Sequence, residues 1–233
     1  MVRRELARHD RPENKIDAQR FHKEKLAERF VLKTPVLRKI SNDIYRCEIR
    51  NRSKKEILSI CDDLLAAGGG PERFMAFDWA GKLHRRYTSA DFSRFELWLK
   101  KYVTNWGACD HLCGSVIGIL LRKYPRLAPR VKKWTGSGNM WLRRAAAVSL
   151  IPAVRKGTGL ADVLATAEKL LTDKEDLVQK GYGWMLKEAS REFPREVFEF
   201  VLLNRRTMPR TALRYAIEKY PAAKRRQAMK KDW

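Results

Sequence analysis

Apolar residues recur at intervals of three and four positions along most of this 233-residue chain. This spacing places them on one face of an α-helix, whereas the strict alternation that predicts strands is rare. Glycine and proline breakers follow at short intervals, as at Gly68-Gly69-Gly70 and Gly136-Ser137-Gly138. The pattern therefore predicts an all-α protein of about twelve helices joined by short turns.

The predicted helices suggest a repeating architecture. Pairing successive helices gives units of roughly 40 residues, the length of a two-helix HEAT-type repeat. We expect an α-solenoid of about six antiparallel HEAT-like pairs, and an irregular compact helical bundle is the alternative. No stretch has the composition of an interdomain linker, so residues 1–233 are expected to form one domain. The basic C-terminal segment, residues 222–233, is expected to fray or to lie on phosphate.

Capping patterns predict where several helices begin. Ser53 and Glu56 match a capping box, in which the serine oxygen and the glutamate carboxylate each accept a backbone N–H at the helix start. Residues 172–175 (Thr-Asp-Lys-Glu) match a second box. Further candidate N-caps, each placed just before an apolar-periodic segment, are Thr34, Thr88, Thr104 or Asn105, and Asn139.

Proline supplies the remaining boundaries. The first long helix is expected over residues 16–31, and later ones are expected to begin at prolines, whose missing N–H costs nothing in a first helical turn. Pro152 falls inside the pattern of residues 140–154, so it should kink or shorten that helix. The prolines expected to open helices are Pro35, Pro71, Pro194, Pro209 and Pro221.

Charge narrows the class of partner. Fifty Lys and Arg against 27 Asp and Glu give a formal net charge of +23. A surface with this excess attracts polyanions at long range, so nucleic acid is the leading partner, with an acidic protein or a membrane face as alternatives. We expect a concave basic face on the solenoid. No apolar run approaches the roughly 20 residues that span a bilayer, and we expect a cytoplasmic monomer with no membrane and no obligate protein partner.

Classical catalytic motifs are missing from the sequence. Cys109, His111 and Cys113 suggest a zinc site, but the second ligand pair that such sites use does not follow, and burial of both thiols is the simpler interpretation. Four cysteines are too few to cross-link a chain of this size, so we expect no disulfides. We also expect no metal and no organic cofactor, since no nucleophile elbow or phosphate-binding glycine loop occurs.

One stretch combines an aromatic ring and a carboxylate. Trp106 and Asp110 lie four residues apart, so on a helix both project from one face. Asp110 is the only acidic residue between Glu96 and Asp162, in a region that contains many arginines and lysines. Trp184 follows Gly181 and Gly183, which leave space around the backbone. Each tryptophan is equally compatible with ordinary packing and with a binding surface.

Five segments carry a resemblance to a known family. They are, in order, VLKTPVLRKISNDI, PERFMAFDWAGKL, VTNWGACD, NMWLRRAAAVSLI and KGYGWMLKEASREFP. In order and spacing they resemble the DNA alkylation repair proteins of the AlkD-like type, which are DNA glycosylases built from HEAT-like repeats. The similarity extends from about residue 20 to residue 220.

The resemblance implies roles for particular residues. It places Trp106, Asp110 and Trp184 in the catalytic site and Arg144 on the DNA backbone. The neighbouring cations are expected to bind phosphates as well; they are Arg143, Arg155, Lys156 and Lys180. An aromatic of the N-terminal helix that can touch DNA falls on Phe21 or His22.

The implied activity is excision of positively charged N3-alkyladenine and N7-alkylguanine from duplex DNA without a deep pocket for a flipped base. Such a base already leaves readily, so the enzyme has to stabilise the cationic sugar, and one carboxylate can do this. Some relatives with this fold bind DNA without glycosylase activity, which makes a non-catalytic module for damaged or branched DNA the first alternative. A HEAT-type scaffold for an acidic protein is the second.

Overall fold

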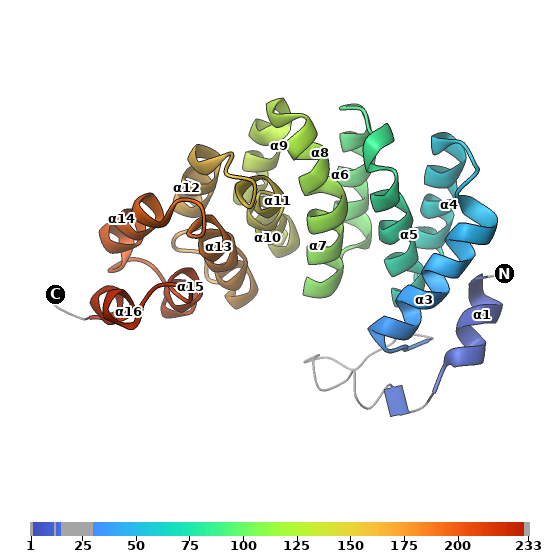
Figure 1. Ribbon diagram of the computed structural model, residues 1–233, viewed down its shortest axis with the longest axis horizontal. Helices are drawn as coiled ribbons and strands as arrows, with labels where there is room; N and C mark the ends of the chain where they lie inside the picture. Colours follow the sequence, from blue (N-terminus) through green and yellow to red (C-terminus); the bar gives the residue numbers. More distant parts are fainter. Residues whose placement is uncertain (1, 12, 15–29, 231–233) are drawn as a thin grey trace. The chain divides into compact units, whose positions relative to one another are not determined.

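The computed structural model describes residues 2–11, 13–14 and 30–230 (Figure 1). Within these residues the regular secondary structure is entirely helical, which confirms the all-α prediction. The helix expected over residues 16–31, with Phe21 and His22, lies outside the described residues except for positions 30 and 31, which are not helical. Contacts divide the chain into two compact units, residues 1–87 and 88–233. The single domain, the six-pair solenoid and the concave basic face stay predictions.

The first unit contains four described helices. They are α1 (Val2–His9), α3 (Thr34–Ile44), α4 (Lys54–Ala66) and α5 (Gly70–Lys82), and a π-helical turn extends α3 to Ile49. Trp79 is fully buried among them, and its indole Nε1 donates to the Ser41 Oγ at 3.0 Å. Ser41 in turn donates to Asp78 at 2.6 Å. The buried indole is thus hydrogen-bonded, as a polar group without water requires.

Helix N-caps were predicted at two positions in the first unit, Ser53 and Thr34. The capping box of Ser53 and Glu56 is confirmed, because the serine oxygen accepts the Glu56 N–H at 3.2 Å and the glutamate accepts the Ser53 N–H at 2.8 Å. Thr34 is not the N-cap of α3, however. Lys33 occupies that position without a side-chain hydrogen bond, and Pro35 lies within the first turn. The fixed φ of proline favours the helical start here in place of a capping side chain.

The second unit contains α6 (Asp91–Tyr102) and then one long helical segment. It comprises α7 (Trp106–Leu112), a π-helical turn (Cys113–Ile117) and α8 (Gly118–Lys123). The helices that follow are α9 (Ala128–Lys132), α10 (Met140–Val148), α11 (Ile151–Val154), α12 (Leu160–Lys169), α13 (Asp176–Ala189), α14 (Pro194–Asn204), α15 (Arg210–Ala216) and α16 (Ala222–Met229).

Two asparagine caps of the second unit are confirmed. The Asn105 side chain accepts the N–H of Ala108 at 2.8 Å, and Asn139 accepts the N–H of Trp141 at 2.8 Å. The expected break at Pro152 is also confirmed, since α10 ends before it and α11 begins with the proline in its first turn.

Two expectations for this unit are wrong. Ala90, and not Thr88, is the N-cap of α6. The box at residues 172–175 does not form, because the Asp173 carboxylate accepts the Glu175 N–H at 2.9 Å in place of a threonine hydroxyl. In the basic C-terminal segment, residues 222–229 form α16, and Arg205 and Arg210 donate to carbonyl groups in its last turn at 2.8 and 3.2 Å. Whether this segment frays or lies on phosphate stays a prediction.

The helix α13 packs against both α10 and α15, and two glycines permit this. A Cβ at Gly183 would lie 2.7 Å from the Tyr215 Cβ and 2.8 Å from the Ala212 carbonyl oxygen on α15. A Cβ at Gly181, on the α10 side, would lie 3.1 Å from the Arg144 Cγ. Only a residue without a side chain allows α13 this close to α15, because backbone atoms cannot move aside cheaply.

Gly183→Ala is therefore expected to destabilise the second unit by about 1–3 kcal/mol, the usual cost of overpacking. Urea denaturation followed by circular dichroism measures this. Gly114→Ala is the matched control, because Gly114 is also helical and an added Cβ there meets no atom within 4 Å. The control should be neutral or slightly stabilising, since alanine favours helix. Equal stability of the two variants would contradict the packing argument.

Candidate active site

Four residues singled out in the sequence line one cavity of the second unit. Trp106 and Asp110 come from α7, Arg144 from α10 and Trp184 from α13. The cavity has a volume of about 360 Å³. Its other lining residues are Leu177, Lys180, Lys187 and Tyr215. Helices that are distant in sequence thus bring one carboxylate and two indoles to a common space.

The start of α7 sets the direction of Trp106 and Asp110. Asn105 caps the helix, so Trp106 is its first residue and Asp110 follows about one turn later on the same face. The Trp106 side chain is 44% exposed, whereas Cys109 on the adjoining face is fully buried. An exposed large aromatic beside a cavity is available to a ligand, in contrast to the buried Trp79, Trp98 and Trp134.

Asp110 and Arg144 form a bidentate ion pair. The Arg144 Nε donates to one carboxylate oxygen at 2.9 Å, and Nη2 donates to the other at 2.8 Å. Only 6% of the Arg144 side chain and 19% of the Asp110 side chain are exposed. The planar guanidinium matches both oxygens, so it fixes the position and the rotation of the carboxylate.

The remaining side of Arg144 is anchored on α13. Its Nη1 donates to the carbonyl oxygen of Leu177, and Gly181 leaves room for the guanidinium. Burial disfavours the charged guanidinium, but the hydrogen bonds and charge of Asp110 outweigh this and raise the pKa of Arg144. Arg144 is therefore a permanent cation that links α10 to both α7 and α13.

Trp184 is oriented by a buried carboxylate on its own helix. Its indole Nε1 donates to Glu188 at 3.1 Å, and the other Glu188 oxygen accepts from the Arg155 Nε at 2.9 Å. Burial raises the pKa of Glu188, but bonds from Arg155 and Trp184 and the charge of Arg191 lower it overall. The Arg155 guanidinium lies 6.0 Å from the centre of the Trp184 ring. The indole is thus held in one orientation at the edge of the cavity.

Comparison with known proteins identifies the family. A sequence model described as DNA alkylation repair enzyme matches residues 2–220. The chain belongs to the DNA alkylation repair enzyme family. A solved structure described as a predicted DNA alkylation repair enzyme from Enterococcus faecalis is similar in fold, with a TM-score of 0.77 and 19% identity, covering 92% of this chain and 97% of that one. No curated protein sequence matches the chain significantly.

Membership of the DNA alkylation repair family confirms the resemblance seen in the five sequence segments. The family implies DNA as the substrate class, which agrees with the net charge of +23. Among residues 2–11, 13–14 and 30–230, no helix is both long and apolar enough to cross a bilayer.

The predicted phosphate-binding residues occupy different environments. Arg144 and Lys180 line the cavity, and Lys180 is paired with Asp176 at 2.6 Å. Arg155 and Lys156 are exposed just after α11, and Arg155 is engaged by Glu188. Arg143 does not line the cavity.

Arg143 instead serves the loop that precedes α10. Its Nε donates to Asp173 at 2.6 Å, and its Nη1 donates to the carbonyl oxygen of Ser137 at 2.9 Å. The neighbouring Arg144 is turned to the other side, toward Asp110. Of two adjacent arginines, one therefore closes a loop and the other reaches the cavity, a difference that the sequence motif alone does not reveal.

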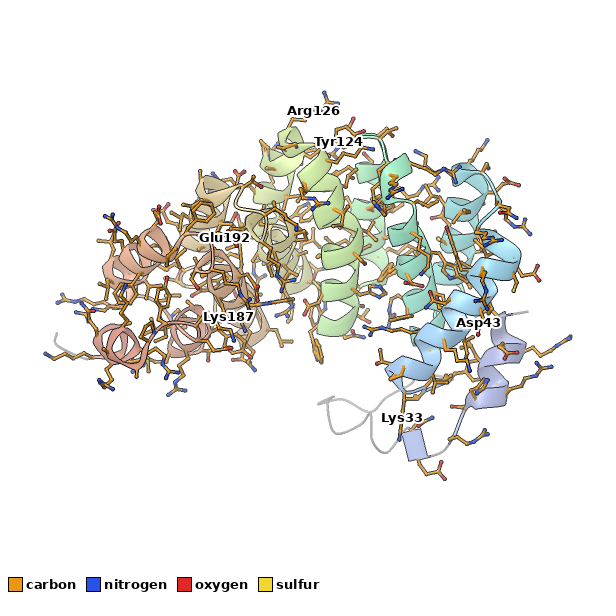
Figure 2. All side chains as sticks on the ribbon, viewed as in Figure 1. Lys33, Asp43, Tyr124, Arg126, Lys187 and Glu192 are labelled. Carbon is orange, nitrogen blue, oxygen red and sulfur yellow. The ribbon has the colours of Figure 1, made fainter. Side chains whose placement is uncertain are left out.

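Three lining residues were missed in the sequence, namely Leu177, Lys187 and Tyr215. Lys187 projects from α13 (Figure 2), pairs with Glu218 at 3.0 Å and lies 5.7 Å from the centre of the Tyr215 ring. Lys187 could have been found, because it follows Trp184 by three positions and shares its helix face. Tyr215 comes from α15, and only the packing at Gly183 brings it to the cavity.

Cys109 and Cys113 lie near this site in the sequence, but their side chains are in the core. Cys109 and Cys113 are fully buried, which confirms their predicted burial, and all four cysteines are free thiols. A hydrogen bond with Cys113 together with burial raises the pKa of the Cys109 thiol, so it stays protonated. In the described part of the chain, no three side chains of the His, Cys, Asp or Glu type meet as a metal site would require.

Replacing Glu188 is expected to release the Trp184 indole. Glu188→Leu should lower the free energy of unfolding by about 1–3 kcal/mol, because the half-buried indole N–H loses its acceptor. Glu188→Gln keeps an acceptor oxygen and loses only the charge. Since the pKa of Glu188 is lowered from 4.5, the stability from its ionised form is present above about pH 4.5 and is lost as the pH falls.

The stability difference between wild type and Glu188→Gln should therefore shrink below pH 4.5. Urea denaturation across pH, with tryptophan fluorescence as the signal, measures both effects. Glu192→Gln is the control, because Glu192 is an exposed carboxylate one turn later (Figure 2). A pH-independent difference would show that the ionised Glu188 has no role in holding Trp184.

Proposed function

We propose that the protein is a monofunctional DNA glycosylase. It hydrolyses the N-glycosidic bond of positively charged N3- and N7-alkylated purines in duplex DNA. The observation that carries the proposal is the convergence of the Asp110 carboxylate and the indoles of Trp106 and Trp184 on one cavity. Membership of the DNA alkylation repair family supports the same chemistry.

The chemistry requires few groups. An alkylpurine with a positive charge leaves as a neutral base when the bond from its ring nitrogen to C1′ breaks, and the bonding electrons go with the base. The sugar then carries the positive charge until water adds to C1′ and loses a proton. Asp110 would stabilise that cation and orient the water. No general acid is needed, because the leaving base requires no proton.

The ion pair with Arg144 limits how much Asp110 contributes. At an effective dielectric near 20, a carboxylate 4 Å from the cation contributes about 4 kcal/mol, and a guanidinium about 4 Å behind it opposes this by about 2 kcal/mol. The remainder of about 2 kcal/mol is worth roughly 30-fold in rate. In return, Arg144 holds Asp110 in place before the reaction, so little reorganisation is needed.

The two indoles supply the other part of the stabilisation. Each could place an electron-rich ring face near the cationic nucleotide, worth about 0.5–2 kcal/mol. Trp106 is exposed and able to meet DNA, whereas Trp184 is held by Glu188. Lys180 and Lys187 at the same cavity would contact phosphates flanking the lesion. The proposed mechanism requires no deep pocket for a flipped base, and the exposed Trp106 at the cavity supports contact with the duplex at the surface.

A non-catalytic module that binds damaged or branched DNA is the second candidate. The bidentate pair favours it, because a carboxylate whose two oxygens are both occupied by Arg144 resembles a structural ion pair. The two candidates differ in whether Asp110 affects a reaction or only stability.

Excision separates these candidates. Wild-type protein is expected to release 7-methylguanine from methylated duplex DNA, and Asp110→Asn should reduce single-turnover release by about 30-fold or more while binding DNA normally. Chromatography of the released base and fluorescence anisotropy of labelled duplex measure the two quantities. Absence of release by wild type at high enzyme excess would leave only the binding module.

Arg144→Lys tests what Arg144 does. If it holds Asp110, lysine cannot reproduce the planar two-point contact, so excision at saturating enzyme should fall about 10-fold or more with DNA affinity nearly unchanged. If Arg144 binds phosphate, affinity should fall and lysine should largely replace it. Lys169→Ala is the control, because Lys169 is an exposed cation outside the cavity and is not among the predicted phosphate contacts.

A further inference from the structure

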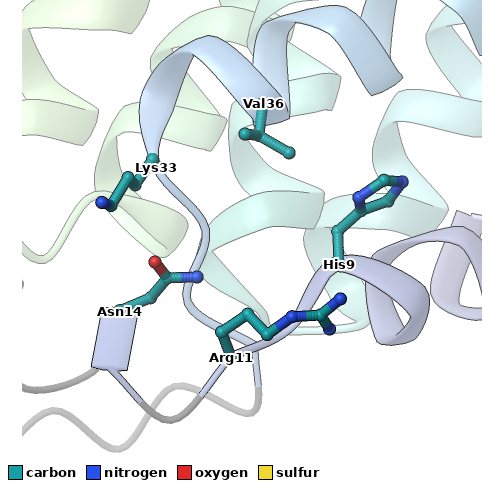
Figure 3. Close-up of a pocket in the computed structure, with 5 residues that line it drawn as sticks. All are labelled: His9, Arg11, Asn14, Lys33 and Val36. Atoms are coloured by element: carbon teal, nitrogen blue, oxygen red, sulfur yellow. The ribbon is translucent and has the colours of Figure 1, made fainter.

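A second cavity lies in the first unit. It has a volume of about 270 Å³ and is lined by His9, Arg11, Asn14, Lys33 and Val36 (Figure 3). His9 and Lys33 lie on opposite sides of it, and Val36 lies across from Arg11. The cavity thus forms where the end of α1 meets the start of α3.

The two sides of this cavity are joined by specific contacts. Asp10 accepts the backbone N–H of Val31 at 3.2 Å, which ties the chain after α1 to the chain before α3. The Arg11 Nη1 donates to the carbonyl oxygens of Arg8 and Asp10 at 3.2 and 2.9 Å. These carbonyls hold one edge of the guanidinium, so Arg11 is already oriented before a ligand arrives.

The lining is positive. Arg11 and Lys33 are cations, the His9 ring and the Asn14 amide can donate, and no acidic side chain is among the described lining residues. Two carboxylates close in sequence already have partners. Asp10 accepts the Val31 N–H, and Glu5 lies 2.9 Å from Arg8 and 3.5 Å from His9. The first turn of α3 contains no acidic residue either. Among the described lining residues, an anion that enters this space meets hydrogen-bond donors and no carboxylate.

We infer that this cavity is a phosphate-binding site that takes a phosphodiester group of DNA. A guanidinium with fixed geometry, an ammonium and an amide suit the several oxygens of one phosphate. Val36 supplies an apolar wall that lowers the local dielectric and strengthens these contacts. The inference rests on the proposed function only in naming DNA as the source of the phosphate.

Val36→Asp tests the site without removing a cation. It places a carboxylate in the cavity, and the fold should tolerate it because an acidic residue in the first turn of a helix is favourable. Thr34→Asp is the matched control, since it adds the same charge to the same helical turn outside the lining. Thermal unfolding monitored by circular dichroism checks that both variants are folded.

The measurement is affinity for undamaged duplex DNA as a function of salt. Val36→Asp should weaken binding about 10-fold at 0.1 M salt and make the slope of log affinity against log salt shallower by about one unit, as for one lost phosphate contact. Thr34→Asp should weaken binding less than about threefold with an unchanged slope. Equal losses in the two variants, or no loss in either, would overturn the inference.

Inorganic phosphate distinguishes the sources of the ligand. Titration with phosphate should shift the NMR signals of the His9 imidazole in wild type and not in Val36→Asp. If phosphate shifts these signals while both variants bind DNA alike, the pocket serves free phosphate and the assignment to DNA is wrong. If wild type binds undamaged DNA through this pocket but releases no 7-methylguanine from methylated duplex, the proposed glycosylase is contradicted and the phosphate site is not.

Discussion

The ion pair of Asp110 and Arg144 is the interaction on which the second unit depends most. It joins α7 to α10, and through the Leu177 carbonyl oxygen it also joins α10 to α13. Both charges are largely buried, so loss of either partner would leave an uncompensated charge in a medium of low polarity. A pair of this kind is costly to build, and its value lies in fixing the geometry of the cavity.

That geometry imposes a compromise. Arg144 weakens the field that Asp110 exerts on a cation, yet it removes the rotational freedom that a solvent-exposed carboxylate would have. Glu188 holds Trp184 by a hydrogen bond, and Arg144 holds Asp110 by an ion pair. In both cases a buried partner fixes the side chain that lines the cavity. The cavity is therefore preorganised, because these side chains are already ordered before a ligand binds and lose little conformational entropy on binding.

Close packing makes this arrangement possible. Gly181 admits Arg144 on one side of α13, and Gly183 admits Tyr215 and α15 on the other. Arginines and lysines have two different roles in this chain. Arg143 pairs with Asp173 and closes a loop, whereas Arg11 and Lys33 have no carboxylate beside them among the described residues that line the first-unit cavity. The same residue types thus serve folding in one place and ligand binding in another.

The sequence by itself determined the helical class, the family and most helix boundaries, because periodicity, prolines and local caps such as Ser53 and Asn105 act within a few residues. It also pointed to Trp106, Asp110, Arg144 and Trp184. Only the tertiary structure decided what those residues contact. The pairing of Arg144 with Asp110, the support of Trp184 by Glu188 and the arrival of Tyr215 depend on how helices pack across gaps of many residues, and that packing leaves no local pattern in the chain.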